Sequence, residues 1–395
     1  MKNQLLHTPE GVRDIYNDEC RKKQMLQDKL KKAIEGYGYQ IIQTPTFEYF
    51  DIFGKEIGTT PAKDLYKFFD REGNTLVLRP DMTPSIARCV AKYYGDEEFP
   101  VRLCYMGNTF INNSSYQGRL KESTQLGAEL IGDNSVDADA EILALVAHAL
   151  KAAGLQEFQI GVGHVGIFQG LVQAAGLEED TEQELLELIS NKNFFGVEEL
   201  VDSLQFPKEL KELFSMLGSL CVSEDMLKRA KELASSFPTI LNALGRLEAL
   251  MEMLSYYGVG KYVSIELGML SSYQYYTGII FAGYTFGSGE PIVKGGRYDQ
   301  LLTYFGKDAP SIGFAVVTDQ LMAALARQKI KIPVKDNGTL IVYRDAKKEE
   351  AIQKASSLRE GGTWVSMVRW EEPKSREDYQ AYAKRMRMPE ILFIM

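Results

Sequence analysis

Apolar residues recur at helical spacing near the start of the chain, over residues 18–35. Leu26, Leu30 and Ile34 lie about one turn apart, and charged residues fill most of the positions between them. Such a stripe buries one face of a surface helix. The pattern therefore predicts an amphipathic helix that ends at the glycine-containing segment GYGY, residues 36–39.

Later runs of apolar residues are short and rich in β-branched and aromatic side chains, which predicts strands. The strands cover residues 40–43, 101–106, 124–131, 158–162, 262–267, 279–284 and 312–317. Two further runs, 65–69 and 74–78, flank the polar sequence DREG, which is typical of a hairpin turn. Asp81 is predicted to cap a helix that continues to Ala91, and another helix is predicted at 135–152.

The pattern changes between Phe168 and Tyr257, where leucines and acidic residues dominate at nearly continuous helical spacing. We expect a first domain over residues 1–325 that carries this segment, 168–257, as a helical insertion. A linker then leads to a small αβ domain over residues 338–395. Its strands and helices alternate, which favours a small parallel sheet.

Composition limits the function classes. The chain has 395 residues, 45% of them hydrophobic, and a formal net charge of −9, which makes nucleic-acid binding unlikely. No apolar run is long enough to span a bilayer, and the N-terminus lacks the apolar stretch of a secretory signal, so a cytoplasmic protein is expected. The four cysteines and three histidines show no metal-ligand spacing. Neither a metal nor a cofactor is predicted.

Six segments follow one another as they do in histidyl-tRNA synthetase. They are Thr8–Asp14, Gly36–Glu48, Leu65–Asp70, Leu78–Thr83, Tyr275–Gly278 and Gly295–Asp299. The resemblance extends over residues 8–325, and the order and spacing of all six make it specific. It implies the α+β fold of a class II aminoacyl-tRNA synthetase catalytic domain, a mostly antiparallel sheet flanked by helices. It also implies a homodimer formed through the first class II motif.

The resemblance places three catalytic arginines at positions where this chain has other residues. Ile111 replaces the arginine of the second motif, Ser271 replaces the one in the RGLDYYTG element, and Gln320 replaces the one that closes the third motif. Asn113 and Ser114 replace two further charged residues of the second motif. Because guanidinium groups bind phosphate oxygens and stabilise developing charge, their loss should abolish amino-acid activation.

The residues that the family uses to bind histidine are largely retained. The resemblance assigns the α-ammonium group to an acidic residue and a glutamine, the imidazole to a glutamate, and the walls to tyrosines. An acidic, aromatic-lined pocket suits a cationic ligand with a ring donor. The matching residues here are Asp81, Thr83, Gln125, Glu129, Tyr275 and Tyr276.

Two points stay open in this pocket. With Ser271 in place of arginine, the ligand carboxylate needs another partner, and Arg88, Arg119 or a backbone group are the candidates. Arg297 and Asp299 either contact the ligand directly or fix the loop that precedes the strand ending at Val317.

A histidine pocket without ATP chemistry resembles the regulatory subunits of ATP phosphoribosyltransferase, the first enzyme of histidine biosynthesis. Such a subunit is itself not an enzyme. The resemblance implies a hetero-octamer with a short catalytic subunit, activation of that subunit, and feedback inhibition by histidine as allosteric effector. The alternatives are a non-catalytic tRNA- or RNA-binding paralogue and an active histidyl-tRNA synthetase with unusual motifs.

We expect no ATP–pyrophosphate exchange in the presence of histidine. Loss of one donor to developing charge typically lowers a rate about 10²–10³-fold, and three such positions have changed. An active histidyl-tRNA synthetase at the same concentration is the positive control. A measurable exchange rate, or tRNA retention on filters that falls steeply with salt, would support one of the two alternatives.

Overall fold

The computed structural model describes residues 6–54, 60–113, 120–219, 221–271, 275–334 and 336–395. The chain divides into two compact units, Met1–Ile332 and Pro333–Met395. The larger unit contains every residue predicted to form a functional site, and the smaller unit has a sheet of its own.

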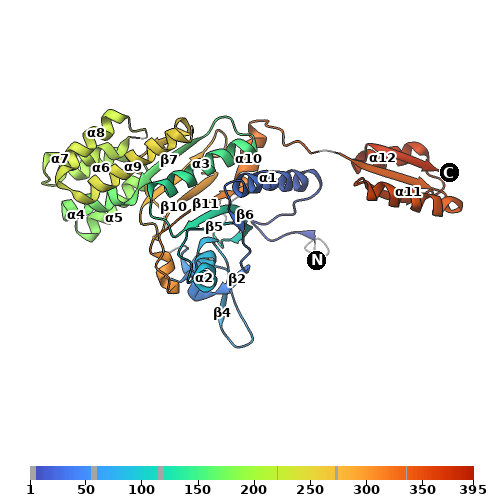
Figure 1. Ribbon diagram of the computed structural model, residues 1–395, viewed down its shortest axis with the longest axis horizontal. Helices are drawn as coiled ribbons and strands as arrows, with labels where there is room; N and C mark the ends of the chain where they lie inside the picture. Colours follow the sequence, from blue (N-terminus) through green and yellow to red (C-terminus); the bar gives the residue numbers. More distant parts are fainter. Residues whose placement is uncertain (1–5, 55–59, 114–119, 220, 272–274, 335) are drawn as a thin grey trace. The chain divides into compact units, whose positions relative to one another are not determined.

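An eight-stranded sheet forms the centre of the larger unit, in the order β1-β5-β6-β11-β10-β9-β7-β8 (Figure 1). The six inner strands pair antiparallel, and only the edge strands β1 and β8 pair parallel to their neighbours. This confirms the predicted mostly antiparallel sheet. The strands are β1 (Gln40–Ile41), β5 (Val101–Phe110), β6 (Glu122–Ile131), β11 (Ser311–Val317), β10 (Val293–Arg297), β9 (Ile279–Tyr284), β7 (Gln159–His164) and β8 (Val263–Ile265).

Three helices pack on one face of this sheet: α1 (Asn17–Glu35), α3 (Val136–Ala153) and α10 (Thr318–Arg327). The predicted stripe of α1 is fully buried at Leu26, Leu30 and Ile34. Ser135 caps α3, as its hydroxyl oxygen accepts the backbone N–H of Ala138 at 3.2 Å. Since successive strand residues point to opposite faces, the apolar even-numbered residues of β6 meet these helices, and the odd-numbered ones face the other side.

The other face carries helix α2 (Thr83–Tyr93) and a small sheet in the order β2-β4-β3. Strands β3 (Lys67–Phe69) and β4 (Thr75–Leu78) form the predicted antiparallel hairpin, and β2 (Phe47–Tyr49) pairs with the other edge of β4. The turn places Gly73 at φ +88°, in the left-handed region that glycine tolerates.

The prediction that Asp81 is the N-cap residue of α2 is wrong by one residue. Met82 occupies the N-cap of α2 and makes no side-chain capping bond. Asp81 precedes it, and its carboxylate accepts the backbone N–H groups of Met82 at 2.7 Å and Thr83 at 3.4 Å. Because Met82 already has helical backbone angles and Pro84 follows at the first turn, the helix starts later and Asp81 is buried beside the sheet.

Helices fill the segment between β7 and β8, at one end of the sheet (Figure 1). They are α4 (Val165–Ala175), α5 (Glu179–Ser190), α6 (Phe194–Ser203), α7 (Lys208–Ser215), α8 (Glu224–Leu233) and α9 (Pro238–Tyr256). Helix α9 packs against both α3 and α4, and the buried leucines of this segment join the main apolar core.

The smaller unit has a three-stranded parallel sheet in the order β13-β12-β14, as the alternating pattern predicted. Helices α11 (Lys348–Glu360) and α12 (Arg376–Arg385) follow β12 (Gly338–Tyr343) and β13 (Trp364–Arg369), and β14 (Glu390–Ile394) completes the unit. The buried residues form two separate apolar clusters, one with α11 and one with α12. Among the described helices of both units, none combines the length and hydropathy that a bilayer-spanning segment requires.

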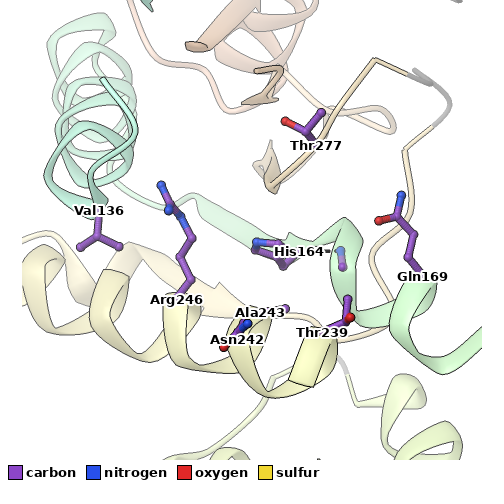
Figure 2. Close-up of a pocket in the computed structure, with 9 residues that line it drawn as sticks. Val136, His164, Gln169, Thr239, Asn242, Ala243, Arg246 and Thr277 are labelled. Carbon is purple, nitrogen blue, oxygen red and sulfur yellow. Dashed lines mark hydrogen bonds between the residues drawn. The ribbon is translucent and has the colours of Figure 1, made fainter. Parts of the chain in front are cut away.

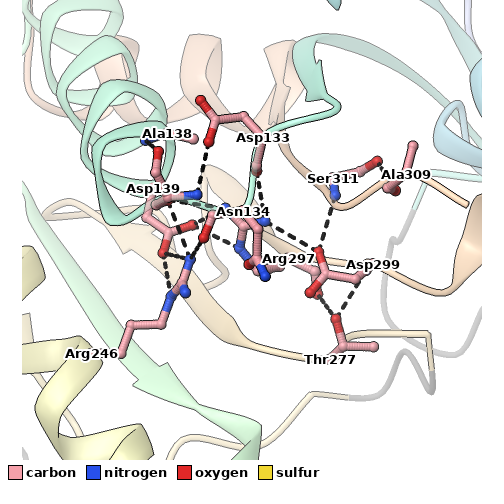
Figure 3. A network of polar contacts seen from close by, with 11 residues as sticks. Asp133, Asn134, Ala138, Asp139, Arg246, Thr277, Arg297, Asp299, Ala309 and Ser311 are labelled. Atoms are coloured by element: carbon pink, nitrogen blue, oxygen red, sulfur yellow. Dashed lines mark hydrogen bonds and ion pairs between the residues drawn. The ribbon is translucent and has the colours of Figure 1, made fainter. Parts of the chain in front are cut away.

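A buried ionic network joins three parts of the larger unit (Figure 3). Asp139 of α3 has no exposed surface; one carboxylate oxygen accepts two bonds from Arg297 of β10, at 2.6 and 2.9 Å. The other oxygen accepts a bond from Arg246 of α9 at 2.7 Å. Asp299 accepts from Arg297 at 3.1 Å and from the backbone N–H of Ser311 at 3.0 Å. Arg297 and Asp299 therefore fix the loop before β11, which is the second of the two alternatives for these residues.

We expect Arg297→Met to lower the free energy of unfolding by about 3 kcal/mol, because it leaves a buried carboxylate short of one partner. Urea unfolding followed by far-UV circular dichroism measures this loss. Tryptophan fluorescence is unsuitable because both tryptophans, Trp364 and Trp370, lie in the smaller unit. Arg229→Met is the matched control. It removes an exposed pair with Glu212 and should cost less than about 1 kcal/mol. Equal losses in the two variants would contradict the prediction.

Candidate functional site

Glycines clear space for large polar side chains on the sheet face that carries α2. Gly313 of β11 lies opposite Glu129 of β6, and Gly127 of β6 lies opposite Tyr105 of β5. A Cβ atom at Gly313 would lie 1.5 Å from Glu129 Oε2, and one at Gly127 would lie 2.5 Å from Tyr105 Oη. No side chain larger than hydrogen fits at either position while these two groups stay in place.

Glu129 lies at the centre of the site and is only 1% exposed. Thr83 Oγ1 donates to its Oε1 at 2.9 Å, and Tyr298 Oη donates to its Oε2 at 2.6 Å. Burial raises the pKa of Glu129 to about 8 even though these hydroxyl donors favour the charged form. The nearby carboxylate of Asp81 contributes to this rise in the pKa. At neutral pH the empty site therefore holds Glu129 mainly in its protonated form.

Asp81 is the second buried acid of the site. Its Oδ1 accepts the two backbone N–H groups at the start of α2, and Tyr275 Oη donates to its Oδ2 at 3.3 Å. Burial raises the pKa of Asp81, against the opposing effect of these hydrogen bonds. The ring of Tyr275 packs 4.8 Å from the ring of Tyr276 and meets the ring of Tyr298 edge-on at 5.9 Å. Two acids thus share an aromatic-walled interior.

The structure brings four of the six predicted residues into one hydrogen-bonded cluster: Asp81, Thr83, Glu129 and Tyr275. Tyr276 is half-buried and lies over Gly296, where a Cβ atom would come within 2.8 Å of its ring. Gln125 lies four residues before Glu129 on the same face of β6. Its Oε1 is buried and has no partner among the described residues.

Two members of the cluster were missed by the sequence analysis. Tyr298 donates to Glu129, and Tyr105 lies beside it with Oη 3.3 Å from the backbone oxygen of Phe314. Tyr298 lies inside the Gly295–Asp299 segment, where only the charged residues Arg297 and Asp299 were candidates for ligand contact. The pairing of Tyr105 with Gly127 depends on strand register, which the sequence pattern does not define.

The three positions that lack the synthetase arginines lie outside this cluster. Ile111 follows β5, and its backbone N–H donates to the carbonyl of Lys121 at 2.9 Å. Ser271 is exposed, and Gln320 is half-buried in the first turn of α10. Ser114, Arg119 and residues 272–274 lie outside the described residues. Arg88, a candidate partner for a ligand carboxylate, is paired with Glu48 at 2.8 Å.

No group of three or more histidine, cysteine, aspartate or glutamate side chains with metal-binding geometry occurs in the part of the chain that the structure describes. The cluster contains two acids that can each accept a hydrogen bond from a cation. Neighbouring hydroxyl groups hold these acids in place, and tyrosine rings surround them. This chemistry suits a small ligand with an ammonium group and a second N–H donor.

Comparisons with known proteins identify relatives over nearly the whole chain. Residues 11–321 match the histidyl-tRNA synthetase family. A protein of Acetivibrio thermocellus is 41% identical over 362 residues, which cover 92% of this chain and 86% of the relative. One of Clostridium kluyveri is 35% identical over 397 residues, covering 99% of this chain and 100% of the relative. Both are named ATP phosphoribosyltransferase regulatory subunit.

Solved structures agree with this. A structure from Bacillus halodurans, described as an ATP phosphoribosyltransferase regulatory subunit/histidyl-tRNA synthetase, superposes with a TM-score of 0.86 at 33% identity and covers 99% of this chain and 98% of that chain. Histidyl-tRNA synthetase from Nostoc superposes with a TM-score of 0.78 at 21% identity, covering 96% of this chain and 89% of that chain, and supports the fold alone. The chain therefore belongs to the family of ATP phosphoribosyltransferase regulatory subunits, which are built on the histidyl-tRNA synthetase fold.

Proposed function

We propose that this chain catalyses nothing by itself and controls a separate ATP phosphoribosyltransferase catalytic subunit, with histidine as its effector. One observation carries the proposal: the buried cluster around Asp81 and Glu129 is intact, while Ile111, Ser271 and Gln320 occupy the positions of the synthetase arginines. The pocket for an amino acid is therefore separable from the groups that would bind and activate ATP.

Histidine satisfies both buried acids at once. Its α-ammonium group lies against Asp81, and an imidazole N–H donates to Glu129. Tyr275 and Tyr276 line the pocket as aromatic walls that favour a cation. A cationic ligand removes the cost of ionising a buried carboxyl group, so the ligand and the charged form of the site stabilise each other. A ligand without these two donors leaves the acids unpaired and is rejected.

Regulation requires that histidine bind the active and inhibited states of the complex with different affinities. The proposed complex is a hetero-octamer with the short catalytic subunit, in which this chain forms a dimer through the first class II motif. An exposed aromatic surface supports that dimer. Phe47 and Tyr49 of β2 are 51% and 57% exposed, and the ring of Phe68 of β3, 37% exposed, packs 5.7 Å from the ring of Phe47. Contiguous exposed apolar groups of this kind mark protein interfaces.

Isothermal titration calorimetry should show histidine binding to the isolated chain. Asp81→Asn and Glu129→Gln should each weaken it about tenfold or more, because each removes a charged partner of a buried donor. Glu184→Gln on the exposed face of α5 is the matched control and should bind as the wild type does. Wild-type affinity in both site variants would mean that histidine binds at another site.

Histidine binding should also release a proton at pH 7, since the pKa of Glu129 is about 8 in the empty site and falls when a donor pairs with the carboxylate. This contribution makes affinity rise with pH by up to about tenfold per unit and level off above the pKa. Calorimetry in buffers of different ionisation enthalpy counts the proton. Glu129→Gln should abolish the release, and unchanged release in this variant would exclude Glu129 as its source.

The regulatory role itself is tested by mixing the chain with a short ATP phosphoribosyltransferase catalytic subunit. We expect turnover to rise when the two are combined and to fall again on addition of histidine. Glu129→Gln should keep the activation and require at least about tenfold more histidine for inhibition. A catalytic subunit whose turnover is the same with and without this chain would overturn the proposal.

A further inference from the structure

A cleft of about 600 Å³ opens between α9, the start of α4 and the N-terminus of α3, separate from the Glu129 cluster (Figure 2). Its polar lining residues are His164, Gln169, Thr239, Asn242, Arg246 and Thr277. Among the described lining residues there is no carboxylate. The small residues Gly166 and Ala243 also line it and leave its floor open. The cleft is therefore rich in hydrogen-bond donors and bears one permanent cation.

His164 presents a donor to this space. It ends β7, and its Nδ1 accepts the backbone N–H of Gly166 at 3.0 Å, which leaves the proton of the neutral ring on Nε2. Burial, together with the neighbouring positive charges of Arg246 and Arg297, lowers the pKa of His164 to about 4. The ring is thus neutral at physiological pH, and Nε2–H has no partner among the described residues.

Arg246 is held rigidly with one edge in use and one edge free. Its Nε donates to Asp139 at 2.7 Å, and its Nη2 donates to the backbone oxygens of Asn134 and Ser135 at 3.1 and 3.3 Å. Its Nη1 has no partner within the described ranges. Asp139 also accepts from Arg297, which pairs with Asp299 as well. Two carboxylates thus face two guanidinium groups, and Arg246 offers the cleft the N–H groups of Nη1.

We propose that this cleft binds a small molecule through an oxyanion, a phosphate or carboxylate group, held by Arg246 Nη1 and His164 Nε2 with Asn242 beside them. Guanidinium groups bind such oxyanions through charge-assisted hydrogen bonds. Helices α3 and α4 both begin at the cleft, at Val136 and next to Gly166, and their N-terminal dipoles add to the attraction. The cleft has the size of small-molecule sites and is larger than one anion needs, so the ligand carries a further moiety.

Calorimetric titration of the full chain with AMP, inorganic phosphate, citrate and adenosine tests this. We expect AMP or citrate to bind with a Kd of about 1 mM or lower, and adenosine not to bind. Asn242→Asp adds a carboxylate at an exposed position of α9 without a change of shape, and should weaken binding about tenfold or more. Asn191→Asp, at the exposed end of α5, is the matched control and should leave binding unchanged.

Binding of AMP and phosphate without citrate identifies the group as phosphate, and binding of citrate alone identifies it as carboxylate. Arg246→Gln is a second variant that removes the cation and should also weaken binding; thermal melts establish that each variant is folded. The proposal is overturned if no anionic probe binds at about 10 mM. It is equally overturned if Asn242→Asp binds the probes as tightly as the wild type.

Discussion

The larger unit depends on one buried carboxylate. Asp139, in the first turn of α3, accepts bonds from Arg297 of the central sheet and Arg246 of the helical insertion. A buried charge of this kind is stable only while its partners remain in place. The two arginines connect Asp139 to two different parts of the larger unit. Arg297 is followed by Tyr298, which reaches Glu129, and Arg246 borders the cleft at the start of α4. The Glu129 cluster and the cleft therefore share one anchor.

Burial distinguishes the residues of the Glu129 cluster from positions 111, 271 and 320. Asp81 and Glu129 are buried and bonded to residues of α2 and to Tyr275 and Tyr298, and Glu129 also lies against Gly313, where no larger residue fits. Substitution of either residue would therefore lower the stability of the fold. Ile111, Ser271 and Gln320 occupy partly or fully exposed positions, where substitutions are usually tolerated within about 0.5 kcal/mol. Side chains at these three positions can therefore change with little effect on the scaffold.

Several elements followed from local pattern alone. The stripe of Leu26, Leu30 and Ile34, the capping serine at 135 and the DREG turn each depend on residues close together in sequence. Asp81 was assigned to the wrong position at α2 because an acidic residue before a helix resembles a cap whether it caps or binds elsewhere. Burial against the sheet, a tertiary effect, made Asp81 part of the Glu129 cluster.

By itself the sequence determined the family, the antiparallel sheet, and four members of the buried cluster, Asp81, Thr83, Glu129 and Tyr275, because each depends on residue type and order. Only the tertiary structure decided that Tyr298 and Tyr105 join them, that Arg297 serves the scaffold, and that His164 and Arg246 line one cleft. These groups lie far apart along the chain. Strand register and the packing of α9 on α3 bring them together, and neither leaves a local pattern in the sequence.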